Sequence, residues 1–493
     1  MFSLANEYEQ LDLMGKVSEI TKLPCQKPSK FLELINKHID LSTLIPLSFK
    51  NAYYASKTNQ RTYSLESMLA ILLLMHFFKF ANVSNFTTML DLSPVLQAFC
   101  RLPDGDCPDE SVLSKFKISF EDEIRLFFEA LSLKVMDIFD EHDSTLAANS
   151  PNKGKNGEAI LDSTGLKPKV KENNPKTLES QIRKQSRVKK FLERKGQGQN
   201  FNPYLAAFKN MPKHAMSNEA IKLGYANGHF GYFYKFGMIT NGFGIPLHIH
   251  FFDKDFYSNL PSDFDTPEDQ KYIYDNASLA PIFKSFYQRI GSRRFHTFMG
   301  DSEFDSYDNY GLLDELGFSK ILIPLNDRNT PLSNEPIPRD SSGIPHCPKD
   351  SCSRFIYDGS CKGKKRSLRF KFVCPKSRKV NNRWTSSCYD KCRDTNSTVT
   401  TYTYTSEDLR TFPGILRESD AWHKLYKRRT IIERELSSMK SHPALERPNT
   451  YNCASMRSDV YLNASAKLLT VMLAFAFGKP QYMRNLRHLL LAA

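Results

Sequence analysis

The spacing of apolar residues divides the chain into a helical first part and a mixed second part. The segment SLESMLAILLLMHFFKF is almost continuously apolar, and it begins with Ser64, a residue that can cap a helix, with Glu66 in the first turn. Two further helical patterns follow, in SNFTTMLDLSPVLQAFC and FEDEIRLFFEALSLKVMDIF. We therefore predict an all-helical N-terminal domain over residues 1–145.

From residue 146 to 325 the pattern changes to short apolar runs typical of strands. The run in EAILDSTGL ends at Asp162, and the run in RRFHTFMGDSEFDS ends at Asp301. Between them, GYFYKFGMITNGFGIPLHIHFF predicts a β-hairpin around the turn NGFG. With a helix at 277–290, a helix in YDNYGLLDEL and a strand in KILIPL, the order is strand, hairpin, helix, strand, helix, strand. This order predicts a mixed α/β fold.

Two segments interrupt this order. The basic insert, which we place at residues 167–225, contains KPKVKENNPKTLESQIRKQSRVKKFLERKGQGQN; such a run is usually a solvated or mobile segment. Residues 326–415 are rich in Pro, Ser, Cys and Lys, but SLRFKFVCP and TVTTYTYT within them have the alternation of strands. We predict a separate, partly β subdomain there, beside the site described below, followed by helices over residues 416–493.

The stretch YKRRTIIERELSSMK, which begins at Tyr426, separates into faces when it is drawn as a regular helix. At roughly 100° per residue, one narrow stripe holds four polar side chains: Tyr426, Arg429, Glu433 and Lys440. An apolar stripe lies next to it, and Glu435 lies on the far side. Such a helix can dock on a core and present the polar stripe at the edge of a cleft. An ordinary charged amphipathic helix has the same pattern, so the stretch alone does not decide between the two.

Composition sets outer limits on function. The chain has 493 residues, 40% of them apolar, which is enough for one large core or several domains. Its formal net charge of +14 favours a polyanionic partner, because each Lys or Arg that neutralises a phosphate releases counterions. The start of the chain lacks the pattern of a signal peptide, and the run LLTVMLAFAFG is too short to span a bilayer. We expect a soluble intracellular protein.

Three carboxylates stand where a mixed α/β sheet can gather them: Asp162, Asp301 and Glu433. Cleavage of a phosphodiester needs an activated oxygen nucleophile and a stabilised leaving oxygen, and two divalent ions about 4 Å apart do both jobs. Carboxylates suit Mg²⁺, a hard ion that prefers oxygen ligands. A single Asp at a strand end is more often a turn or cap residue, so the prediction rests on the ordered trio together with the helix stripe.

The spacing of the stripe also resembles a known signature. Tyr, two residues, Arg, three residues, Glu, six residues and Lys is similar to the signature of bacterial insertion-sequence transposases of the DDE class. The resemblance places the first two acids of that class on Asp162 in AILDSTGLKP and on Asp301 in GDSEFDS. In addition, RTYSLESMLAILLLMHFF followed by PDESVLSKFK looks like the helical N-terminal domain of these enzymes, so the resemblance covers roughly residues 35–475.

This resemblance implies an RNase H-like catalytic core, a mixed sheet flanked by helices, with an insertion before the last catalytic helix. It implies that the N-terminal domain serves DNA binding or dimerisation. It further implies that the three acids bind Mg²⁺ or Mn²⁺, as two ions, and that Arg429 and Lys440 hold DNA phosphates with Tyr426 beside them. Arg suits phosphate through its planar fork, and Lys suits it as a point charge.

The implied activity is cleavage of DNA at the ends of an insertion sequence and transfer of the 3′-OH strand to target DNA. The implied partner is double-stranded DNA, bound by a homodimer in the bacterial cytoplasm at the nucleoid, with no role for a membrane. Two alternatives remain open. The chain can be a catalytically inactive DNA-binding remnant, or a metal-dependent nuclease without strand transfer, and only analysis of the products separates the latter from a transposase.

Two further sets of residues have two interpretations each. Trp422 can stack on an unpaired DNA base, or it can anchor the helix start in the core, which is the commoner role. Six of the ten cysteines crowd into one stretch of the insertion. The spacing of two pairs is close to that of structural zinc sites: Cys347 and Cys352, and Cys388 and Cys392. Structural zinc and free thiols are both compatible with this spacing, and further candidate ligands are Cys361, Cys374 and His346.

Overall fold

A computed structural model describes most of the chain. It covers residues 30–492 except for these segments: 56–60, 103–105, 198–199, 227–228, 254–255, 257–274, 327–338, 341–342, 363–367, 391–397, 405–407 and 418. Of the residues singled out above, Cys392 lies outside the described part.

Helices fill the N-terminal part, as predicted. Their bounds are α2 (Lys30–His38), α3 (Leu41–Leu44), α4 (Leu47–Tyr53), α5 (Leu65–Phe77), α6 (Val83–Asp91), α7 (Pro94–Phe99), α8 (Glu110–Ser119) and α9 (Glu121–Thr145). Ser64 caps α5 by accepting a hydrogen bond from the Ser67 amide, which satisfies one of the free N–H groups of the first turn. Helix α5 is buried on all sides, which explains why its sequence is apolar without a polar face.

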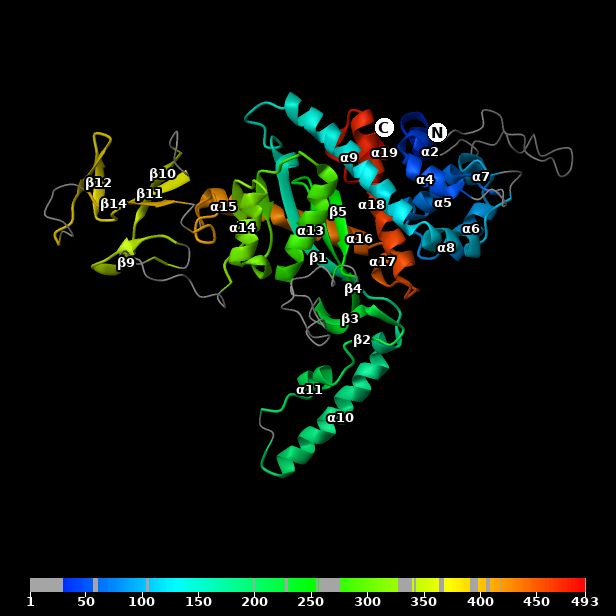
Figure 1. Ribbon diagram of the computed structural model, residues 1–493, viewed down its shortest axis with the longest axis horizontal. Helices are drawn as coiled ribbons and strands as arrows, with labels where there is room; N and C mark the ends of the chain where they lie inside the picture. The colour runs from blue at the N-terminus through cyan, green and yellow to red at the C-terminus, as the bar shows by residue number, and fades with distance from the viewer. Residues whose placement is uncertain are drawn as a thin grey trace.

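The chain returns to these helices near its C-terminus. The last helices are α15 (Asp420–Tyr426), α16 (Thr430–Lys440), α17 (Pro443–Glu446), α18 (Cys453–Ala476) and α19 (Leu486–Ala492). Helix α18, orange-red in Figure 1, runs beside the blue helices α5 and α8 and the cyan helix α9. By length and composition α18 could cross a bilayer, but 78% of its most apolar window is buried inside the structure. This burial is that of a core helix and is consistent with a soluble protein.

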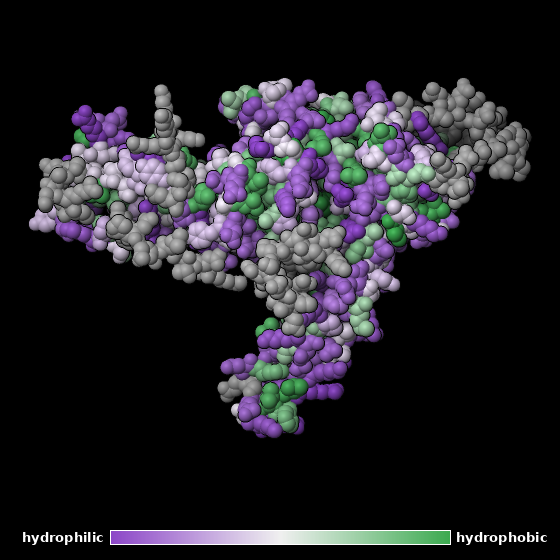
Figure 2. Space-filling view, in the orientation of Figure 1, coloured by the Kyte–Doolittle hydropathy of each residue, from purple (hydrophilic) through white to green (hydrophobic). Residues whose placement is uncertain are grey.

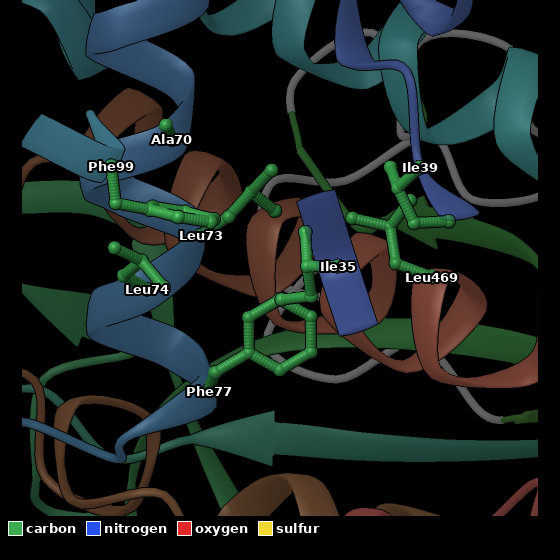
Figure 3. Close-up of a pocket in the computed structure, with 8 residues that line it drawn as sticks. All are labelled: Ile35, Ile39, Ala70, Leu73, Leu74, Phe77, Phe99 and Leu469. Carbon is green, nitrogen blue, oxygen red and sulfur yellow. The ribbon is translucent and has the colours of Figure 1, made fainter. Parts of the chain in front are cut away.

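A small apolar pocket lies between the N-terminal helices and α18 (Figure 3). Its lining carries no polar side chain, and the residues are Ile35, Ile39, Ala70, Leu73, Leu74, Phe77, Phe99 and Leu469. A pocket without convergent polar groups has no means of orienting a substrate. We therefore interpret it as a gap in the packing of the helices and not as a binding site.

The middle of the chain forms a mixed sheet. Its strands are β1 (Glu158–Leu166), β2 (His214–Ala215), β3 (Asn218–Ala226), β4 (His229–Thr240), β5 (Pro246–Phe251), β6 (Thr297–Met299) and β7 (Lys320–Leu322). The order is β2-β3-β4-β1-β6-β7, and β5 also pairs with β4. The pairs β1–β6 and β6–β7 are parallel, whereas β4 runs antiparallel to β1, β3 and β5. The predicted hairpin is β4–β5, so this part of the prediction is confirmed.

Both faces of the sheet are covered by apolar side chains. One cluster joins the sheet to α13 (Asp275–Ile290) and α14 (Tyr307–Glu315), the two helices that the pattern predicted between the strands. The other cluster is continuous with the N-terminal helices and α18. The mixed α/β class with a helical N-terminal part is therefore confirmed.

The first part of the basic insert forms an arm that projects from the sheet, whereas its last part, β2 and β3, belongs to the sheet itself. Helix α10 (Pro175–Arg194) packs along α11 (Pro203–Lys209), and none of the side chains of α10 is buried (Figure 1). The chain enters the arm at Asn173, whose side-chain amide donates to the carbonyl oxygens of Pro168 and Tyr232, each at 2.9 Å. Helix α10 is thus solvated, as its composition indicates, but it has regular structure, and the end of the insert is buried in the sheet.

The predicted insertion subdomain has the expected β character. Its strands are β8 (His346–Cys347), β9 (Asp350–Arg354), β10 (Ile356–Lys362), β11 (Leu368–Val373), β12 (Ser377–Val380), β13 (Arg383–Ser386) and β14 (Thr400–Tyr404). The runs SLRFKFVCP and TVTTYTYT become β11 and β14, which pair in the sheet β10-β11-β14. A small apolar cluster of its own, around Phe370 and Phe372, holds this part together.

After this excursion the chain comes back to the sheet next to the point where it left. The amide of Ile321 in β7 donates to the carbonyl of Pro413 at 2.8 Å. The buried guanidinium of Arg410 donates to both oxygens of Asp305, at 2.9 and 2.7 Å. Because Asp305 follows Asp301 in the same loop, this ion pair ties the returning chain to the loop that carries a predicted site residue.

Replacing Gly414 by Ala is expected to lower the free energy of unfolding by more than about 2 kcal/mol. Gly414 has φ +78°, and a Cβ there would lie 1.9 Å from the carbonyl oxygen of Ser319, so the returning chain would have to move away from β7. The matched control is Gly291→Ala: Gly291 has φ +64° but open space around the Cβ position, so the change costs only the backbone strain of about 1 kcal/mol. Equal destabilisation of the two variants in urea titrations would contradict this account.

Candidate active site

Asp162 lies inside β1, and the expectation that it ends the strand is wrong. The strand continues to Leu166 because β4 is long enough to pair with it throughout, with Asp162 opposite Met238. On its other edge, β1 pairs with β6 only from Glu158 to Ile160. Asp162 therefore sits just past the end of the parallel pairing, at the carboxyl edge where α/β sheets commonly bind ligands.

Asp301 reaches the same edge from the neighbouring strand. β6 ends at Met299, and after Gly300 the side chain of Asp301 caps the short 3₁₀ helix η7 (Ser302–Phe304) by accepting from the Glu303 amide at 2.9 Å. The cap fixes the backbone of Asp301 while its carboxylate remains partly exposed.

The stretch that begins at Tyr426 is not one regular helix. Ser419 caps α15, which ends at Tyr426; a 3₁₀ turn, η8 (Lys427–Arg429), follows, and α16 then continues to Lys440. In this turn Arg428 forms an ion pair with the buried carboxylate of Glu158 at the start of β1. The turn is thus held against the strand that carries Asp162, and the tighter winding accommodates this contact.

The guanidinium of Arg429 connects the predicted site residues. One of its nitrogens, Nη1, lies 3.8 Å from Oδ2 of Asp162, and the other, Nη2, donates to Oε1 of Glu433. The same group lies 5.8 Å from the centre of the Tyr426 ring. Residues far apart in the sequence, on β1 and at the start of α16, therefore meet around one cation.

The pKa shifts connect Asp301 and Lys440 to this group through different residues. Burial acts to lower the pKa of Arg429, but the charges of Tyr426, Glu433, Asp162 and Asp301 outweigh it and raise that pKa. Burial lowers the pKa of Lys440, and Asp162 partly offsets this effect. Burial also raises the pKa of Tyr426, with Asp301 and Glu433 acting in the same direction. Asp301 is therefore within electrostatic range of Arg429 and Tyr426, and Lys440 is within range of Asp162.

Glu435 lies on the opposite side of α16, as the helix wheel predicted. Its side chain is buried and forms ion pairs with Lys467, on α18, and with Arg484, at 3.6 Å. The apolar residues of the neighbouring stripe, Ile432, Leu436 and Met439, are also buried. Glu435 thus holds the helix against the core, whereas Glu433 is half exposed.

Trp422 has the role of a core anchor, the commoner of its two interpretations. Its side chain is buried in the main apolar cluster and stacks on the ring of Tyr426 at 4.7 Å between ring centres. The indole therefore lies between the apolar core and the Tyr426 ring. This contact holds Tyr426, the last residue of α15, in position beside Arg429. A surface for stacking a DNA base is not available on a side chain that is 8% exposed.

The two ion pairs that brace the site were missed in the sequence. Glu158 pairs with Arg428, and Asp305 pairs with Arg410, 270 and 105 residues apart. The available signal was weak: an acidic residue immediately before the apolar run AIL, and a second acid in GDSEFDS. Neither pattern indicates which basic residue pairs with the acid.

No metal-binding cluster is already assembled in the described part of the chain. There, no three His, Cys, Asp or Glu side chains lie close enough together to hold an ion. Cys347 is buried in the apolar cluster of the insertion, Cys352 is exposed on β9, and Cys388 follows β13. With Cys392 outside the described residues, structural zinc remains a prediction.

Comparison with known proteins adds one finding. Residues 22–118 match a family model described as a transposase domain (DUF772). The match covers the helices α2 to α7 and most of α8, within the predicted N-terminal domain. A search of curated proteins gave no match. The family match supports a transposase-family assignment for this region and, in general terms, a DNA-processing function for the chain.

Proposed function

We propose that the chain is a DNA transposase of the DDE class, which cleaves phosphodiester bonds at the ends of an insertion sequence and transfers the 3′-OH strand to target DNA. The observation that carries the proposal is the bridge that Arg429 makes between Asp162 and Glu433. It brings an acid from the central strand and an acid from the last helix to one point, with Asp301 within electrostatic reach. The transposase-domain match at residues 22–118 supports the same function.

The sheet topology is a second line of support. The path β5-β4-β1-β6-β7, with β1, β6 and β7 parallel and β4 antiparallel to its neighbours, is the order expected of an RNase H-like core. In such a core the first acid belongs on the central strand and the second beyond the adjacent parallel strand. Asp162 lies on β1 and Asp301 follows β6, which supports the proposal.

The residues present fit a hard divalent cation. Asp162, Asp301 and Glu433 offer only oxygen donors, and their charges already attract one cationic group, the guanidinium of Arg429. These three acids would hold Mg²⁺ or Mn²⁺, as two ions, which when bound supply activation of the attacking oxygen and stabilisation of the leaving oxygen. Lys440 and Arg429 would bind phosphate oxygens beside the acids, and Tyr426 would line the same surface.

The proposal includes a homodimer on double-stranded DNA, because two ends must be held together, and a location at the bacterial nucleoid. The direct test incubates the purified protein and Mg²⁺ with DNA that carries the ends flanking its own gene. We expect nicks at the element boundary followed by joined products, and loss of both when a chelator removes the metal.

The products also separate the alternatives. Binding to these ends without any nick identifies an inactive remnant. Nicks that are never followed by joined strands identify a nuclease, and either result would refute strand transfer. Gel analysis of both strands distinguishes binding without nicks, nicks without joining, and nicks followed by joining. An unrelated duplex of the same length is the control.

A further inference from the structure

The projecting arm carries an ordered row of positive charges. On a wheel of α10, five exposed basic side chains fall within about 60° of one another, the cationic stripe: Lys176, Arg183, Arg187, Lys190 and Arg194. The opposite side of the helix holds the half-buried Leu178, Ile182 and Leu192, and α10 packs along α11. Figure 2 shows the arm as largely hydrophilic, with some hydrophobic surface near its tip.

We propose that the cationic stripe of α10 binds the phosphate backbone of double-stranded DNA and leads the duplex to the site at Asp162. This inference rests on the proposed function and adds to it a second contact surface, outside the signature residues. From Lys176 to Arg194 the stripe measures about 27 Å along the helix, the length of about eight base pairs.

The charge pattern distinguishes this helix from an ordinary solvated one. Helix α10 holds seven basic residues and two acidic ones, Glu179 and Glu193. Their ion pairs are long and exposed, 3.6 Å to Arg183 and 3.9 Å to Lys189, so they neutralise little of the stripe. A helix that only needs to remain soluble mixes charges of both signs on its exposed face. A row of one sign matches a polyanion.

The side chains favour the backbone of DNA over its bases and over a lipid surface. The stripe consists of Lys and Arg, which suit phosphate oxygens at any sequence. A membrane-bound helix presents its apolar face to the lipid, but α10 packs along α11, and its apolar residues Leu178, Ile182 and Leu192 are already half-buried. The exposed Val188 and Phe191 flank the stripe, so an anionic membrane is the competing partner that the test must separate.

The point at which the arm joins the sheet places one end of the cationic stripe near the end of β1. β1 carries Asp162 and ends at Leu166, and α10 starts at Pro175 after a short connection. The amide of Lys169 in that connection donates to the carbonyl of Pro448, 3.1 Å away, which fixes the arm to the segment after α17. The arm therefore leaves the sheet from the carboxyl end of β1, the end at which the acids gather.

The test neutralises the stripe with five Gln substitutions and compares the variant with a matched control. The control neutralises five exposed cations outside the N-terminal domain and the arm, so that both proteins lose the same net charge: Lys153, Lys284, Arg294, Lys320 and Arg487. Affinity for a duplex of about 30 base pairs is measured by fluorescence anisotropy over a series of salt concentrations. Each phosphate contact contributes about 0.9 to the slope of log K against log salt.

For the stripe variant we expect the slope of log K against log salt to become less steep by about 4. We also expect its affinity for the duplex at low salt to fall at least about tenfold, whereas the slope and affinity of the control should change little. Circular dichroism checks that both variants remain folded. Equal losses in the two variants, or no loss in the stripe variant, would overturn the inference. So would loss of binding to phosphatidylserine vesicles with unchanged DNA binding. All of these measurements report binding and none requires cleavage. The proposed catalytic activity is tested separately, by the nicking of DNA ends, so that failure of one can be told from failure of the other.

Discussion

Replacing Glu433 by Gln is expected to reduce strand cleavage by about a thousandfold while leaving the fold intact. The change removes a negative charge from the group that Arg429 joins to Asp162, and each loss of about 1.4 kcal/mol of transition-state stabilisation costs a factor of ten in rate. Because Glu433 is half exposed, its ion pair with Arg429 contributes little to stability. The measurements are the single-turnover rate of nicking and the thermal midpoint Tm.

The matched control is Glu435→Gln, two residues away on the same helix. Glu435 is buried and its removal leaves Lys467 without its partner, so the free energy of unfolding should fall by about 3 kcal/mol. Per folded molecule, the nicking rate should remain close to that of the parent protein. A Glu433→Gln variant that nicks normally would refute the assigned role, and so would equal loss of rate in both variants.

Replacing Lys117 by Met is expected to destabilise the protein by about 3–5 kcal/mol. The Nζ atom of Lys117, on α8, lies 2.9 and 3.0 Å from the two carboxylate oxygens of Asp459 on α18, and both side chains are buried. Without the ammonium group, the buried carboxylate keeps one ion-pair partner among the described residues, the ring nitrogen of His76 at 3.6 Å. Chemical denaturation of the variant and the parent protein gives the difference directly.

Acid should weaken the same contact in the parent protein. Burial acts to raise the pKa of Asp459, but Lys117 and His76 outweigh it and lower the pKa to about 2, below the ordinary 3.8. The charged pair therefore stabilises the fold fully above about pH 4, and this contribution is lost as the pH falls towards 2. The double variant Lys117→Met, Asp459→Leu should recover much of the loss, because it leaves no unpaired charge. A single variant that loses less than about 1 kcal/mol would contradict this account.

Much of the fold follows from local pattern. The β4–β5 hairpin was predicted from alternation around a turn, and α5 from its capped apolar run, because each signal lies within the element itself. The position of Asp162 in the middle of its strand was not predicted. The residues that follow it, Ser163, Thr164 and Gly165, resemble a turn in sequence. The long partner strand β4 overrides their local preference.

The candidate site likewise has features that local sequence predicts and features that depend on distant residues. The shared side of Glu433 and Lys440, opposite Glu435, was predicted from periodicity, since α16 is regular from Thr430 onward. The 3₁₀ turn before it was not found, because its cause is the contact of Arg428 with Glu158 on a distant strand. The same reason hides the pair Asp305 and Arg410. Long-range ion pairs leave no mark on the local sequence, so only the three-dimensional structure identifies them.

The return of the chain beside its point of departure has a consequence for folding kinetics. The contact between Ile321 and Pro413 closes a loop of about 90 residues, at an entropic cost of about 4 kcal/mol for a flexible chain. A loop that already contains the folded sheet β10-β11-β14 is effectively shorter, so its ends meet more readily. Early folding of the insertion therefore lowers the barrier to docking α15 and α16 on the central sheet.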